Sequence, residues 1–222
     1  MSRARSATTA WRRKSGREHV SEQPALAARL RAIARATPWC MQALHAVAQL
    51  GLAHCCIGAG AVRNLVWDAL HGYAQPSALS DIDVAYFDAH DLLAESEVQL
   101  RQRLATLLPG VPWEVCNQAR VHLWFEAEFG YAVPPLRSLD DAIATWPEFA
   151  TSVGIWLRPD GEIGIVAPHG LDDLFNMVVR HNPARISEGG YAQRLARTDS
   201  AARWPRVTII ACLDAVWIPL AY

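Results

Sequence analysis

Apolar residues recur along most of the chain at helical spacing, and short turns rich in glycine and proline separate the periodic stretches. Leu26, Leu30 and Ile33 follow one another at intervals of four and three residues, which is typical of one face of an amphipathic helix. Similar patterns predict helices at about residues 38–50, 61–70, 92–108, 171–179 and 190–197, with shorter ones opening near Asn117 and Ser138. Glycine or proline follows several of these stretches and marks their ends.

Short apolar runs between the helices predict strands at about residues 54–57, 81–87, 111–116, 152–157 and 162–166. The last two runs flank the segment Arg158-Pro159-Asp160-Gly161, which is a strong signal for a hairpin turn. Helices and strands therefore interleave along the chain, and a hairpin is expected in its C-terminal part.

Composition agrees with an enzyme-sized globular protein. At 222 residues the chain is long enough for one or two domains, and its net charge of −1 argues against a general nucleic-acid-binding surface. No apolar run reaches the length of about 18 residues that spans a bilayer, so no membrane partner is expected. The cysteines lack the spacing of a zinc site or a disulfide framework, so we interpret them as buried thiols in the cytoplasm: Cys40, Cys55, Cys56, Cys116 and Cys212.

The strongest chemical signal is the segment Asp81-Ile82-Asp83-Val84. On a strand, Asp81 and Asp83 point to the same face, roughly 6–7 Å apart, while Ile82 and Val84 point into a core. Two carboxylates this close repel each other unless a cation or a proton compensates them. The pattern therefore indicates a platform for Mg²⁺, which prefers hard oxygen ligands. The simpler alternative is that Asp81 ends a turn and Asp83 is solvated.

A glycine-containing turn lies upstream of these acids, at Gly58-Ala59-Gly60. Backbone N–H groups of such a turn at the start of a helix can bind a phosphate. A tight turn with no ligand is the alternative interpretation. The order of the turn and the paired acids favours phosphoryl or nucleotidyl chemistry.

This order of motifs resembles the DNA polymerase β-like nucleotidyltransferase superfamily, in which a strand ending in Gly-Gly or Gly-Ser, a short helix and a strand with two metal-binding acids follow one another. Residues 60–63 are also similar to the CCA-adding tRNA nucleotidyltransferases, which usually have Asp where this chain has Asn64. A longer similarity, from about residue 40 to about 210, is to a bacterial family of predicted nucleotidyltransferases. It rests on residues 61–64, 67–68, 81–84, 86–88, 113–120, 146–148 and 167–171.

The resemblance implies an α+β, polymerase β-like nucleotidyltransferase fold, with a small mixed sheet flanked by helices, additional helices and a C-terminal hairpin. We expect a disordered basic tail at residues 1–22, with a transit peptide or a start codon assigned too far upstream as alternatives. The nucleotidyltransferase core is expected at 23–145, a hairpin and helices packed on it at 146–210, and a variable tail at 211–222. The family usually has a lysine-rich helix before Trp204-Pro205, and this chain departs from it there.

The resemblance also implies site residues. Asp81 and Asp83 would bind Mg²⁺ (or Mn²⁺), and Glu114 on a later strand would be the third carboxylate, with Asp88 as a competitor. An ordinary acid on a solvated strand face is the alternative for Glu114. Gly58 and Gly60, with Arg63 or Asn64 nearby, would hold the phosphates of a nucleoside triphosphate. Arg120 can meet a triphosphate through its guanidinium, or can pair with Glu126 or Asp88. The tryptophans stand mostly in apolar contexts, which favours core packing, and Trp67 and Trp113, near the expected site in sequence, are the two to test for contact with a nucleobase.

The expected reaction moves a nucleoside monophosphate from a nucleoside triphosphate to a hydroxyl-bearing acceptor and releases pyrophosphate. A catalytically silent nucleotide-binding or interaction module, such as a sensor or a toxin–antitoxin component, is the alternative on the same fold. Hydrolysis of a phosphate ester at the same metals is a second enzymatic alternative. The acceptor remains open among a small molecule, a nucleic acid and a protein, in that order of preference.

Overall fold

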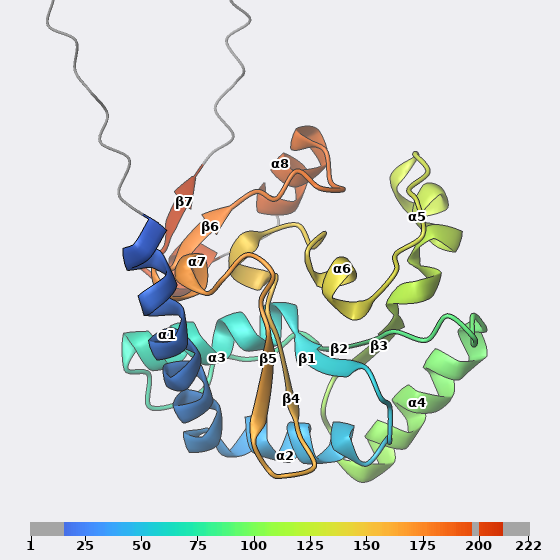
Figure 1. Cartoon of the computed structure of the whole chain (residues 1–222), viewed down its shortest axis with the longest axis horizontal. Helices are drawn as coiled ribbons and strands as arrows, with labels where there is room; N and C mark the ends of the chain where they lie inside the picture. Colours follow the sequence, from blue (N-terminus) through green and yellow to red (C-terminus); the bar gives the residue numbers. More distant parts are fainter. Residues whose placement is uncertain (1–15, 197–199, 211–222) are drawn as a thin grey trace, which may run out of the picture.

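Figure 1 shows the computed structural model of the chain, which describes residues 16–196 and 200–210. A five-stranded sheet in the order β3-β2-β1-β4-β5 forms its centre. The strands are β1 (Cys55–Gly58), β2 (Ile82–Tyr86), β3 (Trp113–Asn117), β4 (Gly154–Leu157) and β5 (Ile163–Val166). β2 and β3 run parallel, and the other neighbouring pairs are antiparallel. The small mixed sheet expected from the sequence is therefore confirmed.

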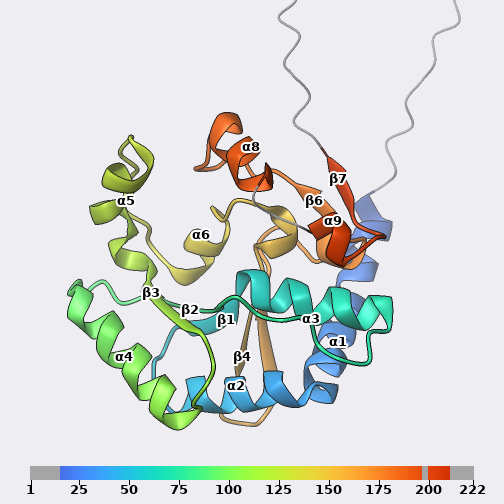
Figure 2. The same cartoon turned by 180° about the vertical axis from the view of Figure 1, so that it is seen from behind.

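Helices lie on both sides of β1, β2 and β3. In both views α2 and α4 lie below these strands, and α5, α6 and α8 lie above them (Figures 1 and 2). The helices are α1 (Gly16–Ala36), α2 (Pro38–Ala48), α3 (Ala59–His71), α4 (Ala94–Leu107), α5 (Val121–Phe129), α6 (Leu139–Ile143), α7 (Asp172–Phe175), α8 (Glu188–Ala196) and α9 (Ser200–Arg203), with 3-10 turns at Gln118–Arg120 and Phe149–Thr151.

The alternation of β2 decides which of its side chains enter the core. Ile82 and Val84 are 2% and 1% exposed and pack with Leu44, Val66 and Leu104 in the main hydrophobic cluster. The side chain of Asp83, between them, faces the opposite side because successive residues of a strand alternate. The burial of two apolar neighbours thus fixes the carboxylate on the side where α5, α6 and α8 lie.

The predicted hairpin is confirmed as β4 and β5, joined by a turn in which Gly161 has a φ of +79°. It also extends the central sheet, because Ile155 and Gly154 pair with Ile57 and Gly58 of β1. The hairpin is therefore continuous with the sheet of residues 23–145 and is not a separate layer packed upon it.

The C-terminal part differs from the expected pattern at residues 171–179. The predicted helix ends at Phe175, and Met177 adopts a φ of +55°, which breaks helical geometry. Val178 and Val179 instead belong to β6 (Val178–Arg180), which pairs in parallel with β7 (Thr208–Ile210). β-branched residues favour such pairing. A partner distant in the sequence overrides the local helical periodicity.

The two terminal segments also bear on expected boundaries. The helix α1 begins at Gly16, so residues 16–22, which composition assigned to the tail, are helical. The rest of the expected basic tail (1–15), residues 197–199 and the variable tail (211–222) lie outside the described residues. Within residues 16–196 and 200–210, no helix is long and apolar enough to cross a bilayer.

We expect Gly154→Ala to destabilise the protein. A Cβ at this position would lie 2.5 Å from Cys56 Sγ and 3.0 Å from Val166 Cγ1, inside the junction between β1 and the hairpin. Overpacking of a filled core typically costs about 1–3 kcal/mol. Urea unfolding measures this loss as a lower midpoint.

Gly189→Ala is the matched control, because a Cβ there meets no atom within 4 Å and the residue lies in α8. Alanine is favoured over glycine in a helix by about 0.5–1 kcal/mol, so this variant should be as stable as the wild type or more stable. Equal midpoints for Gly154→Ala and the wild type would contradict the packing argument.

Candidate functional site

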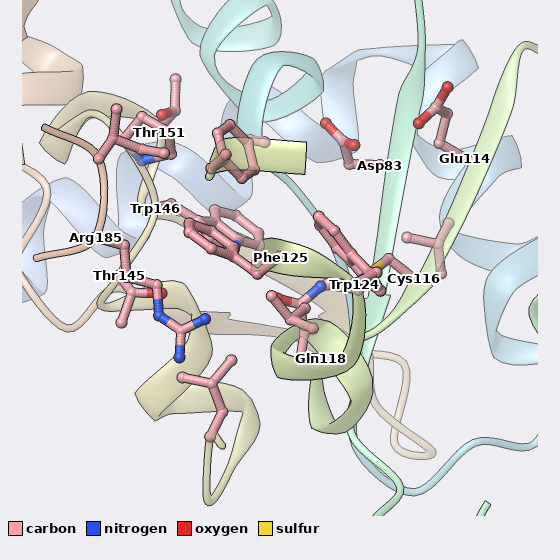
Figure 3. Close-up of a pocket in the computed structure, with 18 of the residues that line it drawn as sticks. Asp83, Glu114, Cys116, Gln118, Trp124, Phe125, Thr145, Trp146, Thr151 and Arg185 are labelled. Atoms are coloured by element: carbon pink, nitrogen blue, oxygen red, sulfur yellow. The ribbon is translucent and has the colours of Figure 1, made fainter. Parts of the chain in front are cut away.

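The strands β2 and β3 bring two of the predicted carboxylates side by side. Asp83 pairs in parallel register with Glu114, and Asp81 directly precedes β2. Figure 3 shows the side chains of Asp83 and Glu114 projecting from neighbouring strands toward the same side. The structure therefore brings together the carboxylates that the sequence placed on separate segments, and Glu114 is exposed to solvent.

The environment of Asp83 holds excess negative charge. Burial, and then the charges of Asp81 and Glu114, raise the pKa of Asp83 from 3.8 to about 6. Arg194 opposes this shift, but it does not cancel it. The site therefore favours a bound cation or a proton at this position.

Two observations bear on whether these residues fit a divalent metal ion. Within the described part of the chain, no group of three or more His, Cys, Asp or Glu side chains has the geometry of a metal site. The donor chemistry of Asp81 and Asp83 nevertheless fits Mg²⁺, which prefers carboxylate oxygens. Their mutual repulsion gives the pair a reason to bind a cation. Glu114, on the neighbouring strand β3, is more exposed than Asp83.

The predicted glycine turn forms the start of α3 beside these acids. Gly58 is the residue before the helix, and a Cβ there would lie 2.5 Å from the Trp146 ring, so only glycine fits under the indole. A Cβ on Gly60 would lie 3.9 Å from Asp81 Oδ1 and 3.8 Å from Arg63 Nη2. The N-terminus of a helix of this length, next to Asp81, can bind a phosphate oxygen.

Arg63 and Asn64 follow in the first turns of α3. Arg63 donates to Asn64 Oδ1 from Nε (3.2 Å) and Nη2 (2.9 Å). Its guanidinium also lies over the rings of Trp67 and Trp204, at 5.4 and 5.3 Å from their centroids. Burial lowers the pKa of Arg63, and Glu148 and Asp81 oppose that change. Asn64 thus orients Arg63, which stands beside the acids.

Arg120 lies apart from this cluster. Its Nη1 donates to Glu97 Oε2 at 2.7 Å, and its Nε donates to the Leu92 carbonyl. The predicted alternatives were pairs with Glu126 or Asp88, whereas the partner is Glu97 on α4. Asp88 is also engaged elsewhere, as its carboxylate accepts from the backbone N–H of His90.

The two tryptophans expected near a nucleobase are both in the core. Trp67 is fully buried and donates from Nε1 to the Leu174 carbonyl, and Trp113 is 5% exposed. The default interpretation, core packing, is therefore confirmed for both, because α3 and β3 turn these side chains inward. Two other tryptophans, Trp124 and Trp146, line the cavity next to Asp83.

This cavity has a volume of about 390 Å³ and extends from Ala59, Asp83 and Glu114 to the aromatic side chains of α5. Figure 3 shows Trp146, Phe125 and Trp124 between the acids on one side and Arg185 on the other. Pockets of about 300–1,000 Å³ hold small molecules and cofactors. The sequence pattern indicates no role for these side chains, although Trp146 lies in a segment shared with the family.

Arg194 of α8 also lines the cavity and was missed. Its Nε lies 3.4 Å from Oε1 of Glu148, which is 1% exposed and whose other carboxylate oxygen, Oε2, is buried without a hydrogen-bond partner. Glu148 thus anchors a guanidinium that lines the same cavity as Asp83 and lowers the pKa of that carboxyl. Residues 148 and 194 are brought together by tertiary packing, which the sequence does not show. The only sequence signal for Glu148 is its place in the segment 146–148 that is shared with the family.

Asp68 holds the loop that leads to the acids. Its carboxylate accepts from the N–H and hydroxyl of Ser77 (2.7 and 2.6 Å) and from Trp204 Nε1 (2.8 Å). The loop, α3 and the C-terminal segment therefore meet at the buried carboxylate of Asp68, which holds the loop that leads to Asp81 in place.

Comparison with known proteins gives the family. The sequence model of a family described as Nucleotidyltransferase matches residues 45–209, which is most of the chain. The chain belongs to this family. The nucleotidyltransferase match includes the glycine turn, the paired acids, Glu114 and the elements that cover the cavity. None of the curated protein sequences matches the chain.

One solved structure in particular gives the fold. A protein whose title states that its NMR structure reveals a CCA-adding enzyme head domain superposes with a TM-score of 0.70 at 27% identity, over 82% of this chain and 95% of that one. A CCA-adding enzyme in apo form II gives 0.44 at 13% identity, over 89% of this chain and 45% of that one. A tRNA-processing enzyme, apo form 2, gives 0.43 at 16% identity, over 76% and 44%. The first match confirms the expected polymerase β-like nucleotidyltransferase fold.

The raised pKa of Asp83 predicts a pH dependence for the stability of the metal-free protein. Well below pH 3.8 the carboxyl is protonated in the folded and unfolded states, and Asp83 adds no penalty. As pH rises from about 4 to about 6 the unfolded state loses this proton while the folded state keeps it, so stability falls. Above pH 7 the carboxyl is ionised in both states and the penalty is complete, about 3 kcal/mol.

Asp83→Asn removes this charge, so in EDTA at pH 7.5 it should be more stable than the wild type, with the difference shrinking toward pH 4.5. Chemical unfolding at both pH values measures it. Asp160→Asn in the hairpin turn, where the amide oxygen can still accept from Glu162 N–H, is the control. A constant difference between Asp83→Asn and the wild type across this range would refute the charge argument.

Proposed function

We propose that the protein is a metal-dependent nucleotidyltransferase, which moves a nucleoside monophosphate from a nucleoside triphosphate to a hydroxyl-bearing acceptor. The observation that carries this proposal is the placement of Asp83 between Glu114 on β3 and the N-terminus of α3. Carboxylates that attract cations and a helix start that binds phosphate thus lie next to each other.

Each residue has a distinct part in this proposal. Asp81 and Asp83 would hold Mg²⁺ (or Mn²⁺), which supplies charge neutralisation on the phosphates and lowers the pKa of a bound hydroxyl. The backbone at Gly58 and Gly60, with Arg63, would bind the phosphates. Glu114, which is in register with Asp83 and exposed, would accept the proton of the acceptor hydroxyl.

Arg194, which lines the cavity, would add a second guanidinium to that of Arg63. Its charge lowers the pKa of Asp83, so it lies close enough to act on the carboxylates before a nucleotide arrives. When a triphosphate binds, its oxygens can replace the carboxylates as the partner of the Arg194 guanidinium. Arg120, bound to Glu97, takes no part in this arrangement.

The transfer involves no change of oxidation state, so it needs no external oxidant or reductant. A lone pair of the acceptor oxygen forms the new bond to the α-phosphorus, and the bond from that phosphorus to the bridging oxygen breaks. The electron pair leaves with pyrophosphate, and the hydroxyl proton passes to Glu114. We place this reaction in the cytoplasm, because Cys40, Cys55, Cys56 and Cys116 are free thiols.

The first test is thermal-shift titration with each of the four nucleoside triphosphates, with and without Mg²⁺ or Mn²⁺. A ligand that binds only the folded state raises its apparent stability. We expect a metal-dependent rise for the wild type and for Asp160→Asn, and its loss for Asp83→Asn. A rise that Asp83→Asn retains would place the nucleotide elsewhere. A rise with no transferred label in cell extract would favour the silent binding module, and nucleotide breakdown with no labelled acceptor would favour hydrolysis.

Arg194→Gln tests the second cation. We expect this variant to need about tenfold more nucleoside triphosphate for half of the maximal shift, because it loses a charge-assisted contact to phosphate. The control is Arg180→Gln, which pairs with Asp173 outside the residues lining the cavity. Equal titration curves for both variants would remove Arg194 from the nucleotide site.

A further inference from the structure

The part of the cavity away from the carboxylates is built differently from the part near them. Its lining is aromatic and aliphatic, with one charged group, and we call these six residues the aromatic pocket: Trp124, Phe125, Phe129, Leu136, Trp146 and Arg185. Three of them lie on α5, which follows β3 directly through the 3-10 turn. Such a lining fits an apolar or ring-containing ligand and offers little to a chain of phosphates.

Arg185 gives the aromatic pocket one directional polar group. Its Nη2 donates to the Pro134 carbonyl at 2.7 Å, and its guanidinium lies 5.6 Å from the centroid of the Phe125 ring. Its Nη1 is buried and has no hydrogen-bond partner. A buried N–H without an acceptor is costly, so a ligand oxygen at this point would be stabilised.

The position of the aromatic pocket relative to the acids indicates which substrate it serves. An in-line displacement at phosphorus needs the attacking oxygen and the leaving oxygen on opposite sides. The phosphate-binding turn lies at the end of β1, Asp83 lies on β2, and Glu114 and the aromatic residues of α5 follow on β3 and after it. Within the aromatic pocket, Trp146 lies against this turn, whereas Trp124, Phe125 and Phe129 of α5 follow β3, on the other side of Asp83 from the turn.

The residues that line the cavity do not form a basic track for a nucleic acid. Among the residues that line it, the cations are Arg185 and Arg194. Lys14 is the sole lysine of the sequence, and Arg120, near the same end of β3, is bound to Glu97. A polynucleotide needs clustered basic side chains along its backbone.

We propose that the acceptor is a small, largely apolar molecule with a hydroxyl group at one end and a carboxylate or carbonyl oxygen at the other, bound in the aromatic pocket. The hydroxyl lies at Glu114 and the second oxygen meets Arg185 Nη1. The inference rests on the proposed function, whose transfer step it completes: the hydroxyl oxygen bonds to the α-phosphorus, pyrophosphate leaves with the electron pair, and Glu114 takes the proton.

The test uses 8-anilinonaphthalene-1-sulfonate, an aromatic anion that fluoresces in apolar sites, as a probe for the aromatic pocket of the full-length folded protein. We expect saturable binding of one probe molecule by the wild type. Arg185→Gln and Trp124→Ala should each weaken it about tenfold, because one removes the charged donor and the other the aromatic wall. Arg158→Gln, in the exposed hairpin turn, is the matched control and should bind as the wild type does. Urea midpoints verify that each variant is folded.

The same samples decide which substrate occupies the pocket. We expect the metal-dependent nucleotide shift to persist at saturating probe and in Arg185→Gln and Trp124→Ala. Mutual exclusion of probe and nucleotide, or loss of the nucleotide shift in both variants, would show that the pocket holds the nucleobase and would overturn the proposal. Displacement of the probe by tRNA at physiological salt would overturn it in favour of a nucleic-acid acceptor.

Failure of this inference is distinguishable from failure of the proposed function. A nucleotide shift that depends on Asp83, together with no saturable probe binding, overturns the acceptor assignment alone. Probe binding that depends on Arg185, with no shift from any nucleotide, overturns the nucleotidyltransferase proposal and with it the role of the pocket as an acceptor site.

Discussion

The site depends on the parallel register between β2 and β3. Ile82 and Val84 must enter the core, so Asp83 can face only the opposite side. Trp113 is buried and pairs with Ile82, which places Glu114 beside Asp83. A shift of one residue would turn the indole outward and the carboxylate inward. Core packing therefore holds two like charges together, and burial, followed by the charges of Asp81 and Glu114, raises the pKa of Asp83.

The C-terminal half of the chain supplies a cation that offsets the negative charge of these carboxylates, and it closes the cavity beside them. Glu148 anchors Arg194 in the cavity that Asp83 also lines, and Trp204 packs edge-on against Trp67 at 5.2 Å while donating to Asp68. These contacts join the acids, the helix that carries the glycine turn and the segments that close the cavity. Because they link residues far apart in sequence, the geometry of the site depends on the tertiary fold as a whole.

The local parts of this site could be predicted from the sequence, because they follow from short-range rules. Alternation in β2 separates Asp83 from its apolar neighbours, and the turn 158–161 specifies a hairpin whatever it packs against. The errors share one cause, which is that a local pattern does not identify the partner of a segment or side chain. The helix expected over 171–179 lost Val178 to a parallel strand, and Arg120 pairs with Glu97 and not with Glu126 or Asp88.

The division of the cavity follows from the same logic. The carboxylates and the glycine turn lie on the central strands and at the start of α3, whereas α5, the segment around Trp146 and α8 build the cover. The reaction at phosphorus depends on the carboxylates and the glycine turn. The covering elements need only allow the acceptor hydroxyl to lie in line with the phosphate. The covering elements are then free to differ between proteins with the same fold, since function resides in sites carried by folds. In this chain the cover is aromatic, with one buried guanidinium N–H that lacks an acceptor, and those two properties select for shape and a single oxygen.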